Sequence, residues 1–216
     1  MKRANLLTKL QKTGIVSVVR ANTSDKAVKI ADAVIAGGIT GIELTYTVPN
    51  ADQVINELVE RYQDTPEVII GAGTVLDATS ARLAIISGAN FIVSPTFDTN
   101  VAKMCNLYQI PYIPGVFTPT EAQAALQAGS EVVKLFPGSL ATPKTISEFK
   151  GPFPYINVMP SGGVNADNIS DWFAAGAFVV GAGNSLVAPA QQNNFAGVTA
   201  NAQAFMSKYH EIMSLA

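Results

Sequence analysis

Residues 118–135 are Thr-Pro-Thr-Glu-Ala-Gln-Ala-Ala-Leu-Gln-Ala-Gly-Ser-Glu-Val-Val-Lys-Leu, and they predict one helix followed by one strand. Thr118 and Pro119 supply an N-cap and a first-turn proline, which are typical of a helix start. The helical pattern ends at Gly129, a common C-terminal residue in helices. The β-rich run 132–135 follows almost at once. The segment therefore predicts a helix, a tight turn and a strand.

The same arrangement recurs along the chain. Similar helix ends stand just before four β-rich runs, at Ala36-Gly37-Gly38, Ser87-Gly88-Ala89, Gln127-Ala128-Gly129 and Ala175-Gly176-Ala177. Strands that alternate with helices indicate βαβ units and a parallel sheet. Eight such runs in a chain of this length fit a small (β/α)8 TIM barrel. The expected strands are 15–20, 41–45, 68–71, 91–94, 112–114, 132–135, 156–160 and 178–180.

A doubly wound α/β sheet is the alternative to the barrel. Such a sheet usually carries a glycine-rich turn after its first strand. Here that turn is Arg20-Ala-Asn-Thr-Ser, which has no glycine, so the barrel is favoured. Leu6, Leu7 and Leu10 recur at helical spacing and predict an N-terminal amphipathic helix. With no linker or second domain visible, residues 1–216 are expected to form a single barrel domain.

The composition excludes several classes of function. The chain has 14 basic and 16 acidic residues, a net charge of −2 and 48% hydrophobic residues, which argues against disorder and nucleic-acid binding. One cysteine and one histidine leave no disulfide framework and no zinc-ligand spacing, so no metal or cofactor is expected. Without a long apolar run or a signal peptide, we expect a cytoplasmic protein with no membrane contact. Cys105, Trp172 and His210 are interpreted as packing or surface residues.

Two charged residues interrupt otherwise apolar strands. Lys134 lies between apolar neighbours in 132–137, and desolvation favours the neutral amine that attacks carbonyls. Period-2 alternation places Glu43 on the inward face of its strand, opposite to Ile42 and Leu44. A lysine at a strand end could instead reach solvent, and an inward carboxylate could serve a structural ion pair. If the two meet, they supply a nucleophile and a general base.

Other strand ends carry candidate binding groups. Arg20 could hold a substrate carboxylate in a bidentate contact, or equally pair with Glu43. Thr74 adds a hydroxyl beside two glycines that could simply form a turn. Two glycine-containing stretches, 161–163 and 181–185, follow the seventh and eighth strands, where this fold commonly binds phosphate.

Six short motifs follow one another along the chain. They are Glu43-Leu-Thr45, Gly71-Ala-Gly-Thr74, Phe91-Ile-Val-Ser-Pro95, Pro114-Gly-Val, Val133-Lys134-Leu-Phe136-Pro137 and Pro160-Ser-Gly-Gly-Val164. Together they resemble the 2-keto-3-deoxy-6-phosphogluconate (KDPG) / 4-hydroxy-2-oxoglutarate (KHG) aldolase family. The resemblance implies a homotrimeric barrel and a metal-independent, class I (Schiff-base) lyase that releases pyruvate in carbohydrate metabolism of the Entner-Doudoroff type.

The resemblance also implies roles for individual residues. Lys134 would form the Schiff base, and Glu43 would be the acid/base residue. Thr74 and Phe136 would line the pyruvate pocket. The other residues expected to bind the keto-acid substrate or its distal end are Thr45, Pro95, Ser161, Gly162, Gly163, Gly183, Asn184 and Ser185.

The chain departs from the best-known members at two positions. Thr47 stands where many members have the arginine that binds the pyruvate carboxylate, and Asn184 stands where many have a serine. Some members share the Thr47-Val48-Pro49 form and have an arginine matching Arg20. We therefore expect Arg20 to bind the carboxylate, because an unpaired buried charge is costly.

The expected reaction is cleavage of KDPG to pyruvate and glyceraldehyde 3-phosphate, with KHG, which would give pyruvate and glyoxylate, as a further substrate. Three alternatives stay open at this point. They are an aldolase for 2-keto-3-deoxy-6-phosphogalactonate, a different phosphate-binding barrel such as a thiamine-phosphate synthase or sugar-phosphate isomerase, and a non-enzymatic scaffold.

Overall fold

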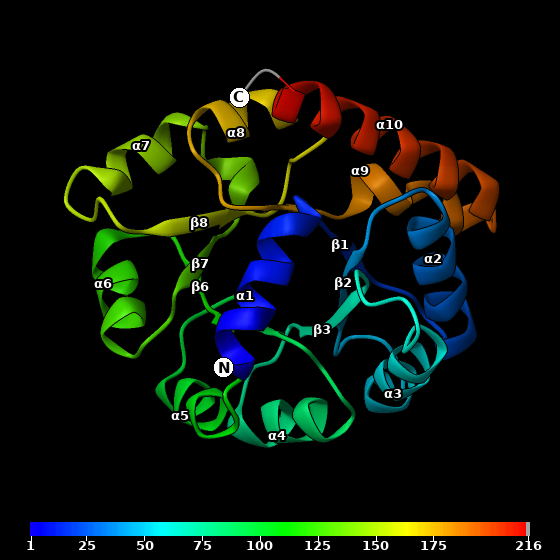
Figure 1. Ribbon diagram of the computed structural model, residues 1–216, viewed down its shortest axis with the longest axis horizontal. Helices are drawn as coiled ribbons and strands as arrows, with labels where there is room; N and C mark the ends of the chain where they lie inside the picture. The colour runs from blue at the N-terminus through cyan, green and yellow to red at the C-terminus, as the bar shows by residue number, and fades with distance from the viewer. Residues whose placement is uncertain (215–216) are drawn as a thin grey trace.

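The computed structural model describes residues 1–214, in which helices and strands alternate along the chain (Figure 1). The strands are β1 (Ile15–Val19), β2 (Gly41–Thr45), β3 (Ile69–Gly73), β4 (Ile92–Val93), β5 (Tyr112–Ile113), β6 (Gly115–Val116), β7 (Val132–Leu135), β8 (Asn157–Pro160) and β9 (Val180–Ala182). The α-helices are α1 (Lys2–Thr13), α2 (Ser24–Ala36), α3 (Ala51–Arg61), α4 (Ala78–Ile86), α5 (Thr99–Tyr108), α6 (Pro119–Gln127), α7 (Lys144–Lys150), α8 (Ile169–Ala174), α9 (Asn184–Val187) and α10 (Phe195–Ser214). Two 3-10 helices are η1 (Gly138–Leu140) and η2 (Ala188–Gln192).

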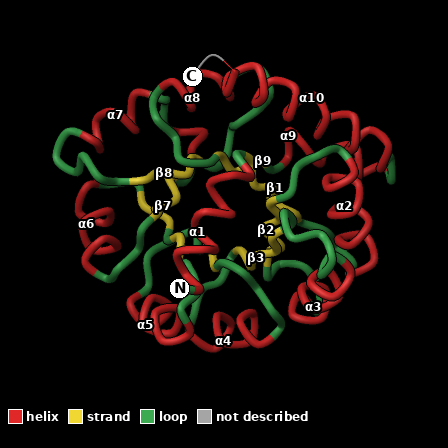
Figure 2. The backbone as a smooth tube through the Cα atoms, viewed as in Figure 1, coloured by secondary structure: helices red, strands yellow, loops and turns green. Residues whose placement is uncertain are grey.

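All paired strands are parallel and form two sheets. One sheet has the order β5-β4-β3-β2-β1-β9, and the other has the order β6-β7-β8. A parallel bridge between Ser161 and Gly181 joins the end of β8 to β9. On the other side, the Lys134 N–H donates to the Pro114 carbonyl between β5 and β6 (2.8 Å). The result is an α/β fold with a curled parallel sheet inside a layer of helices (Figure 2).

The curl of the sheet divides the core into two parts. Apolar side chains on the outer face of the strands, such as Ile42 and Leu44, pack with the surrounding helices. A smaller cluster fills the inside of the curl, and Leu10 of α1 belongs to it. Its members are Leu10, Val16, Ile69, Phe91, Val93, Ile113, Val132, Met159 and Val179.

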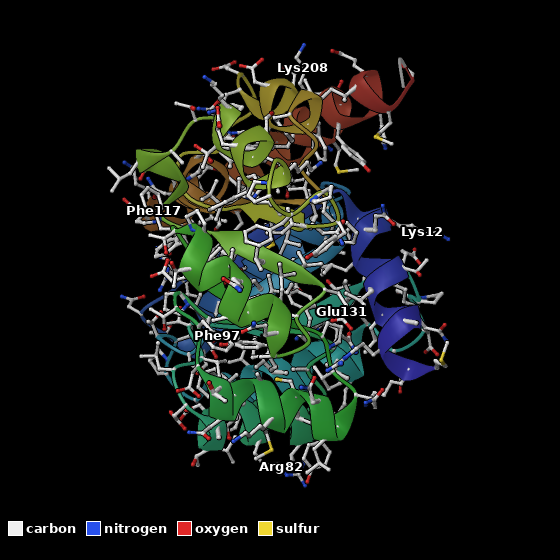
Figure 3. The ribbon with its side chains drawn as sticks, turned by 90° about the vertical axis from the view of Figure 1, so that its left-hand side faces the viewer. Lys12, Arg82, Phe97, Phe117, Glu131 and Lys208 are labelled. Carbon is white, nitrogen blue, oxygen red and sulfur yellow. The ribbon has the colours of Figure 1, made fainter. Side chains whose placement is uncertain are left out.

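Helix α1 covers one end of this inner cluster. Lys12 on α1 and Phe117, in the loop after β6, lie on opposite sides of the molecule (Figure 3). Arg3 fastens the start of the helix through hydrogen bonds to Asn106 Oδ1 (2.5 Å) and the Ile110 carbonyl (3.3 Å). The carboxyl ends of the strands therefore open on the side away from α1.

The expected helix-turn-strand unit of residues 118–135 is confirmed. The Thr118 side chain accepts a hydrogen bond from the Glu121 N–H, and the Glu121 carboxylate accepts one from the Thr118 N–H, so the two form a capping box. β7 has the predicted bounds.

Several other predicted strands have different bounds in the structure. The run 112–114 becomes β5 and β6 with Pro114 between them, because proline has no N–H to donate to a ladder. The last strand lies at Val180–Ala182 instead of 178–180, since pairing with β1 begins where Val180 faces Ile15.

Candidate active site

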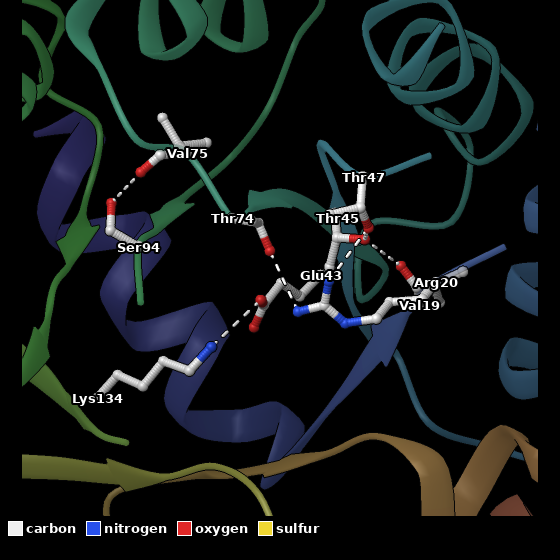
Figure 4. A network of polar contacts seen from close by, with 9 residues as sticks. All are labelled: Val19, Arg20, Glu43, Thr45, Thr47, Thr74, Val75, Ser94 and Lys134. Atoms are coloured by element: carbon white, nitrogen blue, oxygen red, sulfur yellow. Dashed lines mark hydrogen bonds and ion pairs between the residues drawn. The ribbon is translucent and has the colours of Figure 1, made fainter. Parts of the chain in front are cut away.

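Lys134 and Glu43 meet inside the curled sheet, as their positions in the sequence suggested. Lys134 Nζ lies 3.5 Å from Glu43 Oε1, and the side chains are 5% and 0% exposed (Figure 4). β7 and β2 lie on opposite parts of the curl, so the contact depends on the inward direction of both side chains. The pair places a carboxylate within proton-transfer reach of a potential nucleophile.

The other oxygen of the Glu43 carboxylate is free. Oε2 is buried and has no hydrogen-bond partner within residues 1–214. Gly73 of β3 gives the carboxylate its space, because a Cβ at Gly73 would overlap Glu43 Oε1. A buried carboxylate oxygen without a partner is costly and can accept a proton or a hydrogen bond from a bound molecule.

Arg20 is held by a short chain of threonine hydroxyls. Its Nη1 donates to Thr47 Oγ1 (3.1 Å), and its Nη2 donates to Thr74 Oγ1 (3.2 Å). Thr45 Oγ1 lies 2.8 Å from Thr47 Oγ1 and donates to the Val19 carbonyl (3.0 Å) (Figure 4). The guanidinium is therefore oriented before any ligand binds.

These contacts also bear on whether Arg20 forms an ion pair with Glu43. Arg20 was expected either to hold a substrate carboxylate or to pair with Glu43. The structure shows its hydrogen bonds to the Thr47 and Thr74 hydroxyls, and no ion pair between Arg20 and Glu43 among residues 1–214. Thr74 has φ 54°, a left-handed conformation that is uncommon for a threonine. Backbone strain of this kind clusters at functional sites, and here it turns the Thr74 hydroxyl toward Arg20.

A cavity of about 430 Å³ lies at the carboxyl ends of the strands. Lys134 and Arg20 both line it, together with most of the residues expected to bind substrate. The expected residues in its wall are Arg20, Lys134, Phe136, Ser161, Gly162, Gly163, Gly183, Asn184 and Ser185; Val18, Val164 and Asn165 complete it. None of these last three was expected to bind substrate, because their residue types are those of ordinary core and turn positions.

Three expected binding residues lie elsewhere. Thr45 and Thr74 contact the cavity only through the Arg20 network and are not part of its wall. Pro95 lines a separate hollow, together with Phe97 and Phe136. Phe136 lines both hollows, and Lys134 Nζ lies 4.9 Å from the centroid of its ring.

The two glycine-containing stretches come together at one side of the cavity. Gly162 and Gly163 have φ values of 96° and 75°, which glycine adopts without strain. The Ser161 carbonyl accepts a hydrogen bond from the Gly138 N–H (2.8 Å). Ser185 Oγ donates to the Val164 carbonyl (2.6 Å), which ties the second stretch to the first.

The residues interpreted as structural have structural surroundings. Burial raises the pKa of the Cys105 thiol to about 12, so this cysteine is a neutral packing group at physiological pH. Trp172 is buried and His210 is exposed.

Within residues 1–214, no group of three or more His, Cys, Asp or Glu side chains is placed to hold a metal ion. No helix in the same range is long and apolar enough to cross a bilayer.

Comparison with known proteins adds independent findings. The model of a family described as KDPG and KHG aldolase matches residues 6–201. A 2-dehydro-3-deoxy-phosphogluconate aldolase of Treponema pallidum is 34% identical and aligns over 90% of this chain and 92% of the relative. A 2-dehydro-3-deoxy-6-phosphogalactonate aldolase of Escherichia coli K12 is 32% identical over 93% of this chain and 96% of the relative.

A solved structure of similar shape is a KDPG aldolase from Legionella pneumophila, with pyruvate captured as a covalent carbinolamine intermediate. Its TM-score is 0.83 at 25% identity, and the alignment covers 95% of this chain and 98% of that one. The matches favour an aldolase over the scaffold and over other phosphate-binding barrels. The chain belongs to the KDPG and KHG aldolase family and is a lyase.

Proposed function

We propose that the chain cleaves KDPG to pyruvate and glyceraldehyde 3-phosphate, with Lys134 as the Schiff-base residue and Glu43 as the proton carrier. One observation carries the proposal: Lys134 Nζ and Glu43 Oε1 are 3.5 Å apart, and Lys134 lines a cavity that Arg20 and two glycine stretches also line. The Lys134 amine lies at the wall of this cavity, where it can attack the C2 carbonyl of a bound keto acid.

The chemistry follows from this pair. The Lys134 amine adds to the C2 carbonyl to give a carbinolamine, and loss of water gives a protonated imine. Glu43 takes the proton of the C4 hydroxyl through a water, the C3–C4 bond breaks, and its electrons move into the imine. Glu43 then returns the proton to C3 of the enamine, and hydrolysis releases pyruvate and free Lys134. One carboxylate serves both steps, because the first step leaves it protonated for the second.

Arg20 is proposed to bind the pyruvate carboxylate. Thr47 and Thr74 hold its two terminal nitrogens, and this orientation supports a bidentate contact with a carboxylate in the cavity. A hydrogen bond between the Thr45 and Thr47 hydroxyls holds Thr47 in position. Phe136 and the stretch 161–163 are proposed to enclose the carbon chain, with Gly183, Asn184 and Ser185 near its distal end.

The second candidate substrate is 2-keto-3-deoxy-6-phosphogalactonate, because the Escherichia coli relative carries the name of that aldolase. The two substrates share the pyruvate half and differ in configuration at C4, so the same Lys134 and Glu43 can act on both. A cleavage assay on KDPG, its phosphogalactonate epimer and KHG, with pyruvate release as the readout, tests the choice. The proposal requires KDPG to give the highest kcat/KM.

We further propose that the whole chain is a single (β/α)8 barrel domain. β5 and β6 are separated by Pro114 alone and together support one strand position, which gives eight positions around the curl.

We also propose that the protein is a cytoplasmic homotrimer. Exposed apolar side chains on the adjacent helices α4 and α5 support an interface, because Leu83, Ile86 and Leu107 are 46%, 62% and 73% exposed. Light scattering in solution tests the trimer.

A further inference from the structure

Ser94 is a buried polar residue that the proposed mechanism does not use. It lies directly after β4, within the motif 91–95, and is 1% exposed. Its N–H donates to the Ile113 carbonyl of β5 (3.2 Å), so the neighbouring strand holds its backbone. Its Oγ donates to the Val75 carbonyl (2.5 Å), in the loop between β3 and α4. The Ser94 side chain therefore ties this loop to the end of β4 (Figure 4).

The loop that Ser94 holds contains Thr74, whose φ of 54° is unusual for its residue type. Within residues 1–214, the other non-glycine residues with positive φ are two asparagines and one glutamine. A β-branched side chain is an outlier in this left-handed region, whereas glycine adopts it freely. A threonine at such a position indicates that its side chain is used. Here the Thr74 hydroxyl accepts a hydrogen bond from Arg20 Nη2 (3.2 Å).

Hydrogen bonds fix the residues on both sides of Thr74. Before it, the Gly73 carbonyl accepts a hydrogen bond from the Tyr46 N–H (2.8 Å). After it, the Val75 N–H donates to a carbonyl of β4 (3.2 Å), and the Val75 carbonyl accepts from Ser94. A strained backbone conformation persists only where its surroundings over-determine it. Of these bonds, only the one from Ser94 is made by a side chain, so it is the one that a substitution can remove.

We propose that Ser94 is a positioning residue for the substrate carboxylate. Its hydroxyl holds the Val75 carbonyl, and this contact keeps Thr74 in the left-handed conformation. Thr74 in turn orients the Arg20 guanidinium, which binds the carboxylate. Ser94 is not part of the wall of the active-site cavity, so it acts on the substrate through these contacts. This inference rests on the proposed function, because it takes the carboxylate to bind at Arg20.

The first test compares the wild type with Ser94→Ala. Pyruvate affinity is measured by calorimetric titration, and KDPG cleavage is followed by steady-state kinetics. The variant should bind pyruvate about three- to tenfold more weakly, which corresponds to the loss of one hydrogen bond. KM for KDPG should rise by a similar factor while kcat changes less, because the contact between Lys134 and Glu43 is unchanged.

Thr13→Val is the matched control for the loss of a buried hydroxyl. Thr13 is buried as well, and its Oγ1 donates to the Leu10 carbonyl (2.7 Å) at the opposite end of the curl. This variant should be destabilised in urea titrations but should keep the pyruvate affinity and the KM of the wild type. An equal loss of pyruvate affinity in Thr13→Val and Ser94→Ala would show that Ser94 has only a structural role.

A double-mutant cycle tests whether Ser94 acts through Thr74. Thr74→Ala alone should weaken pyruvate binding, because Arg20 loses one of its hydroxyl partners. In the Thr74→Ala background, Ser94→Ala should add no further loss, because the hydroxyl through which it acts is gone. Additive losses in the cycle, or wild-type pyruvate affinity in Ser94→Ala, would overturn the inference.

A crystal structure of ligand-free Ser94→Ala separates this inference from the proposed function, because it requires neither turnover nor pyruvate. Thr74 should leave the left-handed region, and its hydrogen bond with Arg20 should be lost. If Thr74 keeps a φ near 54° and its contact with Arg20, the positioning role of Ser94 is wrong. Wild-type pyruvate affinity in Arg20→Met would instead refute the carboxylate role of Arg20 in the proposed function, and the crystal structure would still decide whether Ser94 positions Thr74.

Discussion

Gly73 faces Glu43 so closely that a Cβ at position 73 would occupy the place of Glu43 Oε1. The two residues lie on neighbouring strands without being direct partners: in the parallel register of β2 and β3, Gly73 is opposite Thr45 and Glu43 is opposite Gly71. The position of the carboxylate relative to Lys134 therefore depends on the absence of a side chain one strand away.

Gly73→Ala should displace the Glu43 carboxylate and slow turnover, while the lysine stays available. The cost in stability should be about 1–3 kcal/mol, as for other overpacked core sites. We expect kcat to fall strongly and borohydride trapping of pyruvate to persist in steady-state and mass-spectrometric assays. Wild-type kcat in this variant would contradict the tight placement of Glu43.

Lys134→Ala should abolish the covalent adduct. Incubation of the wild type with pyruvate and borohydride should add mass to the peptide that carries Lys134, because its amine is buried beside Glu43. Lys103→Ala, on the exposed face of α5, is the matched control and should label normally. Labelling that survives Lys134→Ala would assign the nucleophile to another residue.

Glu43→Gln should separate proton transfer from imine formation. The amide keeps the shape of the side chain but carries no proton between C4 and C3, so kcat should fall by about 10²–10⁴-fold. The adduct with pyruvate should still form, because Lys134 supplies the nucleophile. Single-turnover and trapping measurements on the same preparation check both parts. A variant that turns over at the wild-type rate would move the acid/base role to another group.

Arg20→Met should weaken the binding of pyruvate by about 1.5–3 kcal/mol, the range for hydrogen bonds to charged groups. Thr47→Val should have a smaller effect in the same direction, because it removes one of the two hydroxyls that orient the guanidinium. Calorimetric titration with pyruvate measures both. Arg61→Met is the control, since Arg61 pairs with Asp32 and Glu57 on the surface. Unchanged pyruvate affinity in Arg20→Met would refute the carboxylate role.

Cys105 makes stability depend on pH in the alkaline range. Burial raises its pKa in the folded protein to about 12 from an ordinary value of 9.0. Above pH 9 the unfolded chain therefore loses this proton while the folded protein keeps it, so the free energy of unfolding should fall as the pH rises from 9 toward 12. Urea titrations at several pH values should show a shallower fall for Cys105→Ala. An identical slope in the variant would show that Cys105 does not contribute.

The inward direction of Lys134 and Glu43 was predictable from the sequence because strand alternation is local. The pattern of β2 alone placed Glu43 opposite to Ile42 and Leu44, and the apolar neighbours of Lys134 marked it as unusual. Lys134 and Glu43 can meet only if the parallel sheet curls so that their strands face each other. The recurring helix ends indicated a sheet of this kind.

Other features depend on contacts between distant segments and were not predictable in this way. In the sequence, Thr47 indicated only that the usual carboxylate-binding arginine is missing. In the structure Thr47 positions Arg20, which lies 27 residues earlier in the chain. Pro95 follows a strand as expected, but it lines a hollow separate from the cavity that contains Lys134. The separation of β5 from β6 at Pro114 could have been found from the missing N–H of proline, because this rule needs only the local sequence.

The position of α1 bears on the order in which substrates enter and products leave the site. With Leu10 packed into the inner cluster at one end of the curl, substrate and both products pass through the opposite mouth. Lys134 is buried below this mouth, so in the proposed mechanism the pyruvate unit bound to the lysine is the inner of the two fragments after cleavage. On this proposal the aldehyde departs first, and in the synthetic direction pyruvate enters before the aldehyde, which gives an ordered kinetic mechanism with pyruvate as the leading substrate.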